Sequence, residues 1–350
     1  MAVKAETDGR DIDTSLAQLS GEGAQQNIQH PDEHLQKIAP APWERVPQVS
    51  GVETTYYDRP MLKQSVWSID IPLYYFVGGA AGAALTLGAA MQLAARGGRR
   101  NRELRNLSAH CHWIGIIGST AGAALLIHDL GRPSRFLYMM RVFRPTSPMN
   151  MGAWILAGAA PTAIATGLLI NRRGPLGTLG QASGYASGVF GAALAGYTGV
   201  LVSNSVIPIW QPSRRWMPVL FVASAAASAA SILDLFYEGK AAGRVTSVFG
   251  TAGRLAEIAA ARRVEQLSSA VPKVGEPFHR GAASVLWKAA AALTAGSLAM
   301  SLVGKRRLVG VFGAAGSLCL RFAVHALSNA SARDPKASFA QQRSALPARG

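Results

Sequence analysis

The sequence has few of the residues that hold small secreted proteins together. Its 350 residues include two cysteines, Cys111 and Cys319, which lie far apart. Two isolated cysteines exclude a disulfide framework and an iron–sulfur ligand set within this chain. Charged residues make up 15% of the chain, whereas hydrophobic residues make up 49%. This composition excludes a disordered or collagen-like chain and favours a helical protein that crosses a membrane several times.

Acidic residues are scarce beyond the first part of the chain. Residues 1–66 carry 6 Lys and Arg against 10 Asp and Glu, whereas residues 67–350 carry 29 against 9. The first segment mixes charges with Pro, Gln and His, and it has no apolar run long enough for a signal peptide. We therefore predict a polar N-terminal arm at 1–66, a transmembrane domain at 67–332 and a polar C-terminal tail at 333–350.

Long runs with few charges predict eight transmembrane helices. The clearest is Ile71 to Ala95, about 25 residues without a charge, which is followed by a cluster of arginines. Seven further runs of about 17 to 24 residues follow it: Ser108 to Ile127, Met151 to Ile170, Ala182 to Ser205, Trp216 to Leu233, Val245 to Ala261, Ala282 to Val303 and Leu308 to Leu327. The run that begins at Val245 is short and contains Arg254 and Glu257, so an amphipathic helix in the interface is the alternative there.

The distribution of Lys and Arg predicts the orientation of the chain. The odd-numbered connections between spans hold more of them than the even-numbered connections. This bias places the odd connections in the cytoplasm and both termini, including the arm, outside it. Four arginines of the second connection oppose the bias, which makes them candidates for function rather than topology. They are Arg132, Arg135, Arg141 and Arg144.

The first polar cluster stands where the first span begins, in the string WSIDIPLYYFVGGAAG. Asp70 directly precedes the apolar run, so one interpretation is that it caps the helix, with Trp67 and Tyr74 in the interfacial aromatic belt. The functional interpretation is a carboxylate and a phenol that hydrogen-bond a polar head group and exchange its protons.

The second cluster lies in the string IHDLGRPSRFLYMMRVFRPTSPMNMGAW, where His128 and Asp129 end the second span. The first helix begins on the membrane face where the second ends, so Asp70, His128 and Asp129 belong to one surface. Histidine supplies a base that titrates near neutral pH, and Arg135 supplies a fixed positive charge for an anionic ring oxygen. The alternative is a structured loop whose arginines pair with Asp129 or with lipid phosphates.

Three charged residues within later spans form a third group, because charges at membrane depth are costly. Arg254 and Glu257 are three residues apart and are placed to pair on one helix face. Together with Arg321 they are candidates for a proton relay, and a pair kept for structural specificity is the alternative. His112 and His128 share one helix and lie about 24 Å apart, so they cannot ligate one haem iron. We expect no haem.

The two strings, together with the tail LRFAVHALSNASARDPKASFAQQR, resemble landmarks of the NrfD/PsrC family, the membrane subunits of polysulfide reductase, nitrite reductase and related respiratory complexes. The resemblance extends from about Tyr56 to the C-terminus. It implies an all-α integral protein of the cytoplasmic membrane, with eight transmembrane helices arranged as two four-helix bundles. It also implies that a quinone, menaquinone or ubiquinone, binds near the extracytoplasmic surface.

The same resemblance implies the partners and the site. Electrons would pass between the quinone and a 4Fe-4S ferredoxin-like subunit, which connects to a catalytic subunit, often a molybdopterin enzyme of anaerobic respiration. Membrane lipids complete the expected partners, and no nucleic acid is expected. The predicted proton-exchanging residues are Asp70, His128 and Asp129. The predicted quinone-binding residues are Trp67, Asp70, Tyr74, His128 and Arg135.

Two other functions remain open from the sequence. One is a transporter in which Arg254, Glu257 and Arg321 line a substrate path at the membrane midplane. The other is a purely structural anchor for the partner subunits. The quinone-interacting anchor agrees with the polar cluster at the membrane surface, so it is the function we expect.

Overall fold

The computed structural model describes residues 11–13, 18–20, 60, 62–63, 65, 67–95, 101–236 and 239–345. It divides into two compact units, Met1–Glu53 and Thr54–Gly350. In the first unit, β1 (Asp11–Asp13) pairs antiparallel with β2 (Gln18–Ser20). Most of the predicted polar arm at 1–66 lies outside the described residues.

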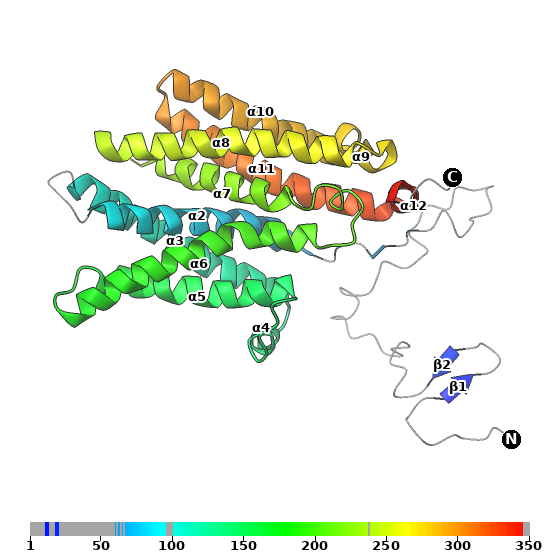
Figure 1. The fold of residues 1–350 in the computed structure, drawn as a ribbon, viewed down its shortest axis with the longest axis horizontal. Helices are drawn as coiled ribbons and strands as arrows, with labels where there is room; N and C mark the ends of the chain where they lie inside the picture. The colour runs from blue at the N-terminus through cyan, green and yellow to red at the C-terminus, as the bar shows by residue number, and fades with distance from the viewer. Residues whose placement is uncertain are drawn as a thin grey trace. The chain divides into compact units, whose positions relative to one another are not determined.

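The second unit is built from helices that run back and forth beside one another (Figure 1). Each of the eight predicted runs overlaps one long helix and extends beyond its bounds by at most two residues. These helices are α2 (Asp70–Ala94), α3 (Asn101–Asp129), α5 (Pro148–Leu169), α6 (Pro175–Ser203), α7 (Met217–Leu233), α8 (Lys240–Ser268), α10 (Ala282–Leu302) and α11 (Arg306–Arg333). The described part of the chain also has three shorter helices: α4 (Ser134–Met139), α9 (Pro272–His279) and α12 (Pro335–Ala345), the last of which lies in the predicted polar tail.

Six helices of the described chain are long and apolar enough to cross a membrane: α2, α3, α5, α6, α10 and α11. The chain is therefore an integral membrane protein with several spans. Two of the eight predicted spans fall short of the same criteria. Helix α7 is apolar but has 17 residues, and α8 carries charged residues along its length.

The helices contact one another in two sets. We call α2, α3, α5 and α6 the first helix group, and α7, α8, α10 and α11 the second helix group. Within each group every helix contacts two others. Between the groups, α2 contacts α7 and α11, α6 contacts α7, and α3 contacts α8. Helices α2 and α6 of the first group therefore both pack against α7 of the second.

Glycines allow α2 and α6 to cross closely. A Cβ atom placed on Gly82 would lie 2.5 Å from the carbonyl oxygen of Gly191, and one placed on Gly191 would lie 2.6 Å from the carbonyl oxygen of Gly82. Real Cβ atoms do not approach backbone atoms this closely, so the crossing requires glycine on both helices. This is the small-residue packing that brings membrane helices into backbone contact, and it holds the middle of α2 against α6.

Candidate functional site

Four polar side chains meet where α2 begins and α3 ends. The Nδ1 atom of His128 lies 2.7 Å from Oδ2 of Asp70. The hydroxyl of Ser68 lies 2.9 Å from the same Asp70 oxygen and 2.7 Å from Oδ1 of Asp129. The structure thus brings Asp70, His128 and Asp129 together, and Ser68 links the two carboxylates. We call these four residues the polar cluster.

The interpretation of Asp70 as a helix cap is wrong. The N-cap position belongs to Ile69, which makes no capping hydrogen bond, and Asp70 is the first residue inside α2. Its own backbone N–H donates to the hydroxyl of Ser68 at 3.2 Å. The carboxylate instead accepts hydrogen bonds from His128 and Ser68, while its negative charge in the first turn also favours the helix dipole.

The contact with Asp70 determines which nitrogen of His128 carries the proton. An ionised carboxylate only accepts hydrogen bonds, so Nδ1 is the donor and Nε2 keeps its lone pair in the neutral ring. The side chain of His128 is 80% exposed, whereas that of Asp70 is 15% exposed. The cluster therefore presents a basic nitrogen at the surface, backed by a carboxylate that stabilises the ring when it is protonated.

Asp129 is held by two hydrogen bonds from one residue. The backbone N–H of Ser68 donates to its Oδ1 atom at 3.0 Å, in addition to the hydroxyl contact. A hydroxyl has one proton, so at any moment Ser68 donates to either Asp70 or Asp129. The segment before α2 is thereby tied to the end of α3, which keeps the histidine and the two carboxylates in one place.

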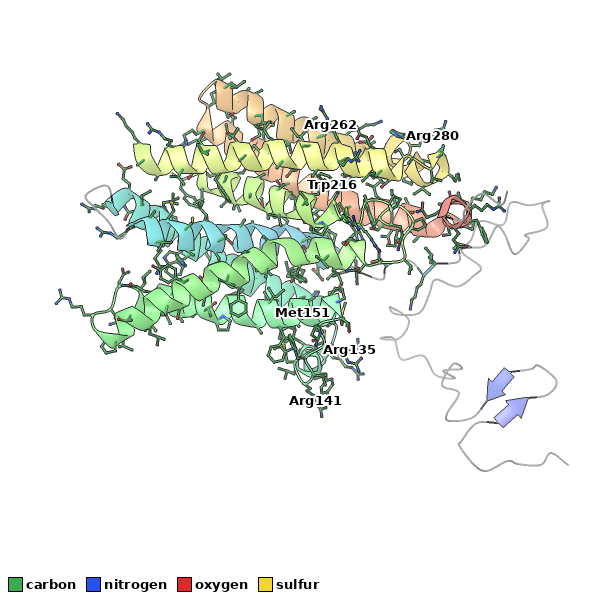
Figure 2. The ribbon with its side chains drawn as sticks, viewed as in Figure 1. Arg135, Arg141, Met151, Trp216, Arg262 and Arg280 are labelled. Atoms are coloured by element: carbon green, nitrogen blue, oxygen red, sulfur yellow. The ribbon has the colours of Figure 1, made fainter. Side chains whose placement is uncertain are left out.

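The other predicted site residues have partners outside this cluster. Tyr74 is buried, 1% exposed, and its hydroxyl hydrogen-bonds that of Tyr197 on α6. Trp67 is half-buried and packs edge-on against Tyr75. Arg135 is exposed on α4 and donates to the carbonyl oxygen of Leu130 at 3.0 Å, in a segment that projects from the long helices (Figure 2).

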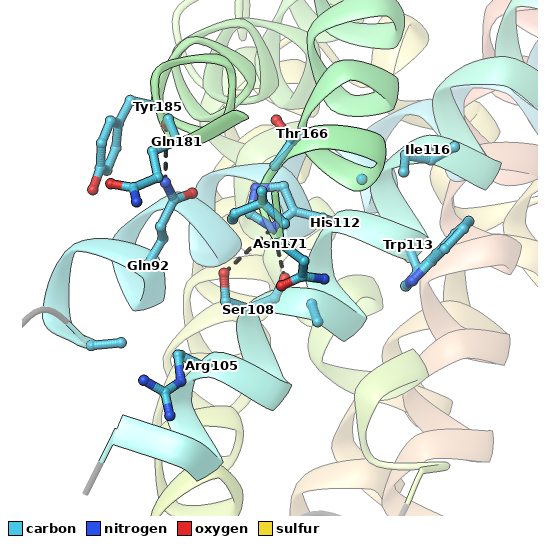
Figure 3. A pocket seen from close by; sticks show the side chains of 14 residues that line it. Gln92, Arg105, Ser108, His112, Trp113, Ile116, Thr166, Asn171, Gln181 and Tyr185 are labelled. Atoms are coloured by element: carbon cyan, nitrogen blue, oxygen red, sulfur yellow. Dashed lines mark hydrogen bonds between the residues drawn. The ribbon is translucent and has the colours of Figure 1, made fainter. Parts of the chain in front are cut away.

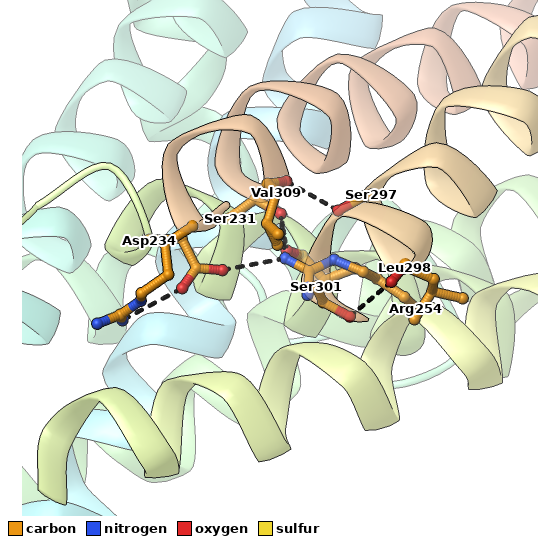
Figure 4. A network of polar contacts seen from close by, with 9 residues as sticks. Ser231, Asp234, Arg254, Ser297, Leu298, Ser301 and Val309 are labelled. Atoms are coloured by element: carbon orange, nitrogen blue, oxygen red, sulfur yellow. Dashed lines mark hydrogen bonds and ion pairs between the residues drawn. The ribbon is translucent and has the colours of Figure 1, made fainter. Parts of the chain in front are cut away.

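Arg254 does not form the ion pair expected from its spacing. Its Nη2 atom lies 3.2 Å from Oδ2 of Asp234, at the end of α7, and 3.0 Å from the hydroxyl of Ser231 (Figure 4). Asp234 also pairs with Arg306 at 3.3 Å. Side chains on a helix lean toward its N-terminus, which directs Arg254 to the end of α7 rather than along α8 to Glu257.

Glu257 is instead held by hydroxyl groups of two other helices. Its Oε1 atom accepts from Thr294 of α10 at 2.7 Å, and its Oε2 atom accepts from Ser317 of α11 at 3.3 Å. Both Glu257 and Arg254 are buried. Both charges therefore face the protein interior, where each has partners on other helices instead of the predicted pairing with each other.

Arg321 lies deep between α7 and α11. Its guanidinium lies 4.0 Å from the ring centre of Phe221, and Nη2 donates to the carbonyl oxygen of that residue at 3.0 Å. Its Nε and Nη1 atoms make no hydrogen bond within the described chain. The carboxyl group of Glu257 also acts on it electrostatically. The second helix group therefore holds a cation with spare donors beside a carboxylate.

Two residues of this region were given no role by the sequence analysis. Ser68 bridges the carboxylates, and its place two positions before Asp70 was the available signal. Tyr75 is buried against Phe221 and Trp67, and its hydroxyl makes no hydrogen bond in the described part of the chain. Nothing in the sequence separates Tyr75 from the neighbouring Tyr74.

The sequence profile of a family described as polysulphide reductase, NrfD matches residues 59–312. The match includes the whole polar cluster and the buried pair of α7 and α8, and it ends before Arg321. No curated protein matches the chain significantly.

Proposed function

The chain belongs to the polysulphide reductase NrfD family, and from this premise we propose that it is the quinone-reactive membrane subunit of its complex. Membership identifies a membrane subunit of a respiratory oxidoreductase that works with other oxidoreductase subunits. The proposal adds the route of the electrons. They pass between a membrane quinone, menaquinone or ubiquinone, and a 4Fe-4S ferredoxin-like subunit, which connects to a catalytic subunit of the molybdopterin type.

The single observation that carries this proposal is the 2.7 Å contact between His128 and Asp70 at an exposed helix end. A quinol gives up two protons together with its two electrons, so its site needs a base with access to water. His128 offers Nε2 as that base, and Asp70 orients the ring and stabilises its protonated form. Asp129 and Ser68 hold the pair in position.

The connection after the polar cluster supports a partner subunit on the same side of the membrane. Four large apolar side chains of this segment are exposed by 57 to 65%: Leu137, Tyr138, Val142 and Phe143. The four arginines of the second connection lie before, between and after these side chains in the sequence. An apolar patch among positive charges favours a partner with an acidic rim, and we assign this surface to the iron–sulfur subunit.

We also propose that all eight long helices cross the cytoplasmic membrane as two four-helix bundles, which are the first and second helix groups. Helix α8 is the critical case. Its charges Arg254 and Glu257 are buried among partners from other helices, so the helix does not present them to lipid. With eight spans both termini lie on one side, and the excess of Lys and Arg in the odd connections places that side outside the cytoplasm.

The buried charges are the candidate proton relay in this proposal. Glu257 is the group able to gain and lose a proton, and the fixed cations Arg254 and Arg321 lie on either side of it along the second group. Hydroxyl groups of Thr294 and Ser317 hold its carboxylate. The arrangement supports relay chemistry because an arginine stays charged and so stabilises the carboxylate form.

The test is quinol turnover by the assembled complex. Asp70→Asn keeps the shape of the side chain but removes the carboxylate, and His128→Ala removes the base. We expect each to lower turnover about a hundredfold or more, the usual contribution of a positioned acid–base group. The matched control is His279→Ala, because His279 is also exposed and lies 3.9 Å from a carboxylate, that of Glu265. It should keep the parental rate.

Parental turnover in both variants, with normal assembly of the partner subunits, would show that the polar cluster is not the quinol site. Equal losses in His279→Ala would show that the effect is not specific to the cluster.

A further inference from the structure

A cavity lies in the first helix group, at the end opposite the polar cluster. It has a volume of about 280 Å³ and is lined by side chains from α2, α3, α5 and α6 (Figure 3). Gln92 on the cavity wall lies near the end of α2, whereas Asp70 begins that helix. At 1.5 Å per residue the two lie about 33 Å apart. The cavity and the polar cluster therefore belong to opposite faces of the membrane.

His112 is a buried polar residue of this cavity, at 3% exposure. Its Nδ1 atom lies 2.7 Å from the carbonyl oxygen of Ser108 and 3.4 Å from the hydroxyl of the same residue. That hydroxyl donates its own proton to the carbonyl oxygen of Gly88 at 2.8 Å. Both atoms facing Nδ1 are therefore acceptors, so Nδ1 carries the hydrogen and Nε2 keeps a lone pair.

The lone pair on Nε2 has no donor within the described residues. The ring edge formed by Nδ1 and Cε1 lies against Gly88 of α2, so Nε2 points away from that helix. The backbone of Gly184 on α6 also acts on this ring. Burial disfavours a charged imidazole ring, and the cavity wall includes Arg105 but no carboxylate.

Gln92 repeats this pattern. Its Nε2 atom donates to the carbonyl oxygen of Gln181 at 3.0 Å, which leaves its Oε1 atom as an acceptor, and that atom also makes no hydrogen bond within the described chain. A buried acceptor without a donor is costly. A ligand for this cavity should therefore bring hydrogen-bond donors.

The walls indicate what kind of donor fits. Trp113, Ile116 and Ile170 form apolar surface around the polar atoms, and Trp113 is 56% exposed where the cavity opens. Apolar walls with a few placed polar atoms favour a ring rather than a hydrated ion. A quinol has two hydroxyl donors on such a ring, whereas the carbonyl oxygens of a quinone only accept and would face the lone pair of His112.

We propose that this cavity is a second binding site for the membrane quinone, selective for its quinol form, in which His112 accepts a hydrogen bond from one ring hydroxyl. The site binds and positions the quinol and transfers no electron. The inference rests on the proposed function, because that function supplies the ligand. A phospholipid with a hydroxylated head group, drawn by Arg105, is the other source of a hydroxyl donor.

The test measures protection of a cysteine at the cavity. Asn171 is exposed and lies on its wall, so Asn171→Cys in the full chain should react with a maleimide in phosphatidylcholine nanodiscs. We expect decylubiquinol to slow this reaction about tenfold and decylubiquinone to have little effect. Asn204→Cys is the control, because Asn204 is exposed just beyond the other end of α6 and should stay unprotected.

Variants of His112 locate the hydrogen bond. In the Asn171→Cys background, His112→Asn keeps a donor near Ser108 but lacks the distal acceptor, so decylubiquinol should bind about tenfold more weakly, as expected for one lost hydrogen bond. His112→Gln carries an amide near the position of Nε2 and should stay within about threefold. Gly167→Leu should also abolish protection by filling the cavity, because a Cβ there meets only the mobile end of Ile116.

Each contrary result has one meaning. The inference is overturned if decylubiquinol binds His112→Asn as tightly as the parent or if it protects both cysteines equally. It is also overturned if phosphatidylglycerol protects Asn171→Cys and decylubiquinol does not. If Asp70→Asn loses turnover while Asn171→Cys stays unprotected, this inference alone fails. If Asn171→Cys is protected while Asp70→Asn turns over normally, the proposed site at the polar cluster alone fails.

Discussion

The two helix groups bury polar atoms in different ways. In the first group the buried polar side chains are neutral, such as the hydrogen-bonded hydroxyls of Tyr74 and Tyr197, and the ionised cluster stays at an exposed helix end. In the second group ionisable side chains lie in the middle of the helices, as with Arg254 and Glu257.

This difference indicates what stabilises each group. The helices of the first group approach until their backbones touch, which needs glycine and leaves no room for a charge. The helices of the second group also meet at glycines, because a Cβ atom on Gly310 would lie 2.7 Å from the carbonyl oxygen of Ser231. They differ in that they also bury long side chains, whose charges are compensated by Asp234 and by hydroxyl groups. Close packing should therefore dominate the stability of the first group, whereas the second group also depends on satisfied charges.

The largest effect is expected where a buried charge loses its partner. Asp234→Ala leaves Arg254 buried without its carboxylate, which costs about 3–5 kcal/mol of unfolding free energy. The measurement is denaturant unfolding of the purified chain in mixed micelles. The control is the double variant Asp234→Ala, Arg254→Leu, which removes both charges and should lose less than the single variant. A double variant as unstable as the single would show that charge compensation is not what stabilises the second group.

An intermediate effect is expected at the close crossing of the first group. Gly82→Ala places a methyl group 2.5 Å from the carbonyl oxygen of Gly191, and overpacking of this kind costs about 1–3 kcal/mol. Gly79→Ala is the matched control on the same helix, because its methyl group would lie 3.5 Å from the Cβ atom of Ala225. It should be neutral in the same unfolding assay. Equal losses at both positions would mean that helix contact distance does not set stability here.

The smallest effect is expected for an ion pair at the surface. Lys273 lies 2.6 Å from Glu276 and 3.2 Å from Asp334, and both Lys273 and Glu276 are more than a third exposed. Lys273→Ala should leave the unfolding midpoint almost unchanged, because water and salt screen such pairs. A loss as large as that of Asp234→Ala would remove the distinction between buried and surface charges.

The same pair gives a pH dependence with a defined sign. The hydrogen bond from Lys273 lowers the pKa of Glu276, and the hydrogen bond to Glu276 raises the pKa of Lys273. A carboxyl whose pKa is lower in the folded state stabilises the fold above its unfolded pKa, and this contribution is lost as the pH falls through the lowered value. Any small difference between the parent and Lys273→Ala should therefore vanish in acid.

Part of the site followed from the sequence. The directions of α2 and α3 placed Asp70 beside His128 and Asp129, because adjacent antiparallel helices bring the start of one to the end of the other. The role of each atom did not follow. The sequence allowed Asp70 to be a helix cap, whereas the structure shows its carboxylate in contact with His128. The sequence did not indicate a role for Asp234, because this residue lies just after an apolar run.

The sequence by itself determined that the chain is an integral membrane protein of long helices, because apolar runs of that length are stable as helices in lipid. Only the tertiary structure decided the partner of each polar group, such as Asp234 for Arg254 and Tyr197 for Tyr74. The cavity around His112 likewise arises only when four helices come together. The physical reason is that an apolar pattern determines where a helix runs, whereas side-chain partners depend on the rotation and crossing distance of packed helices.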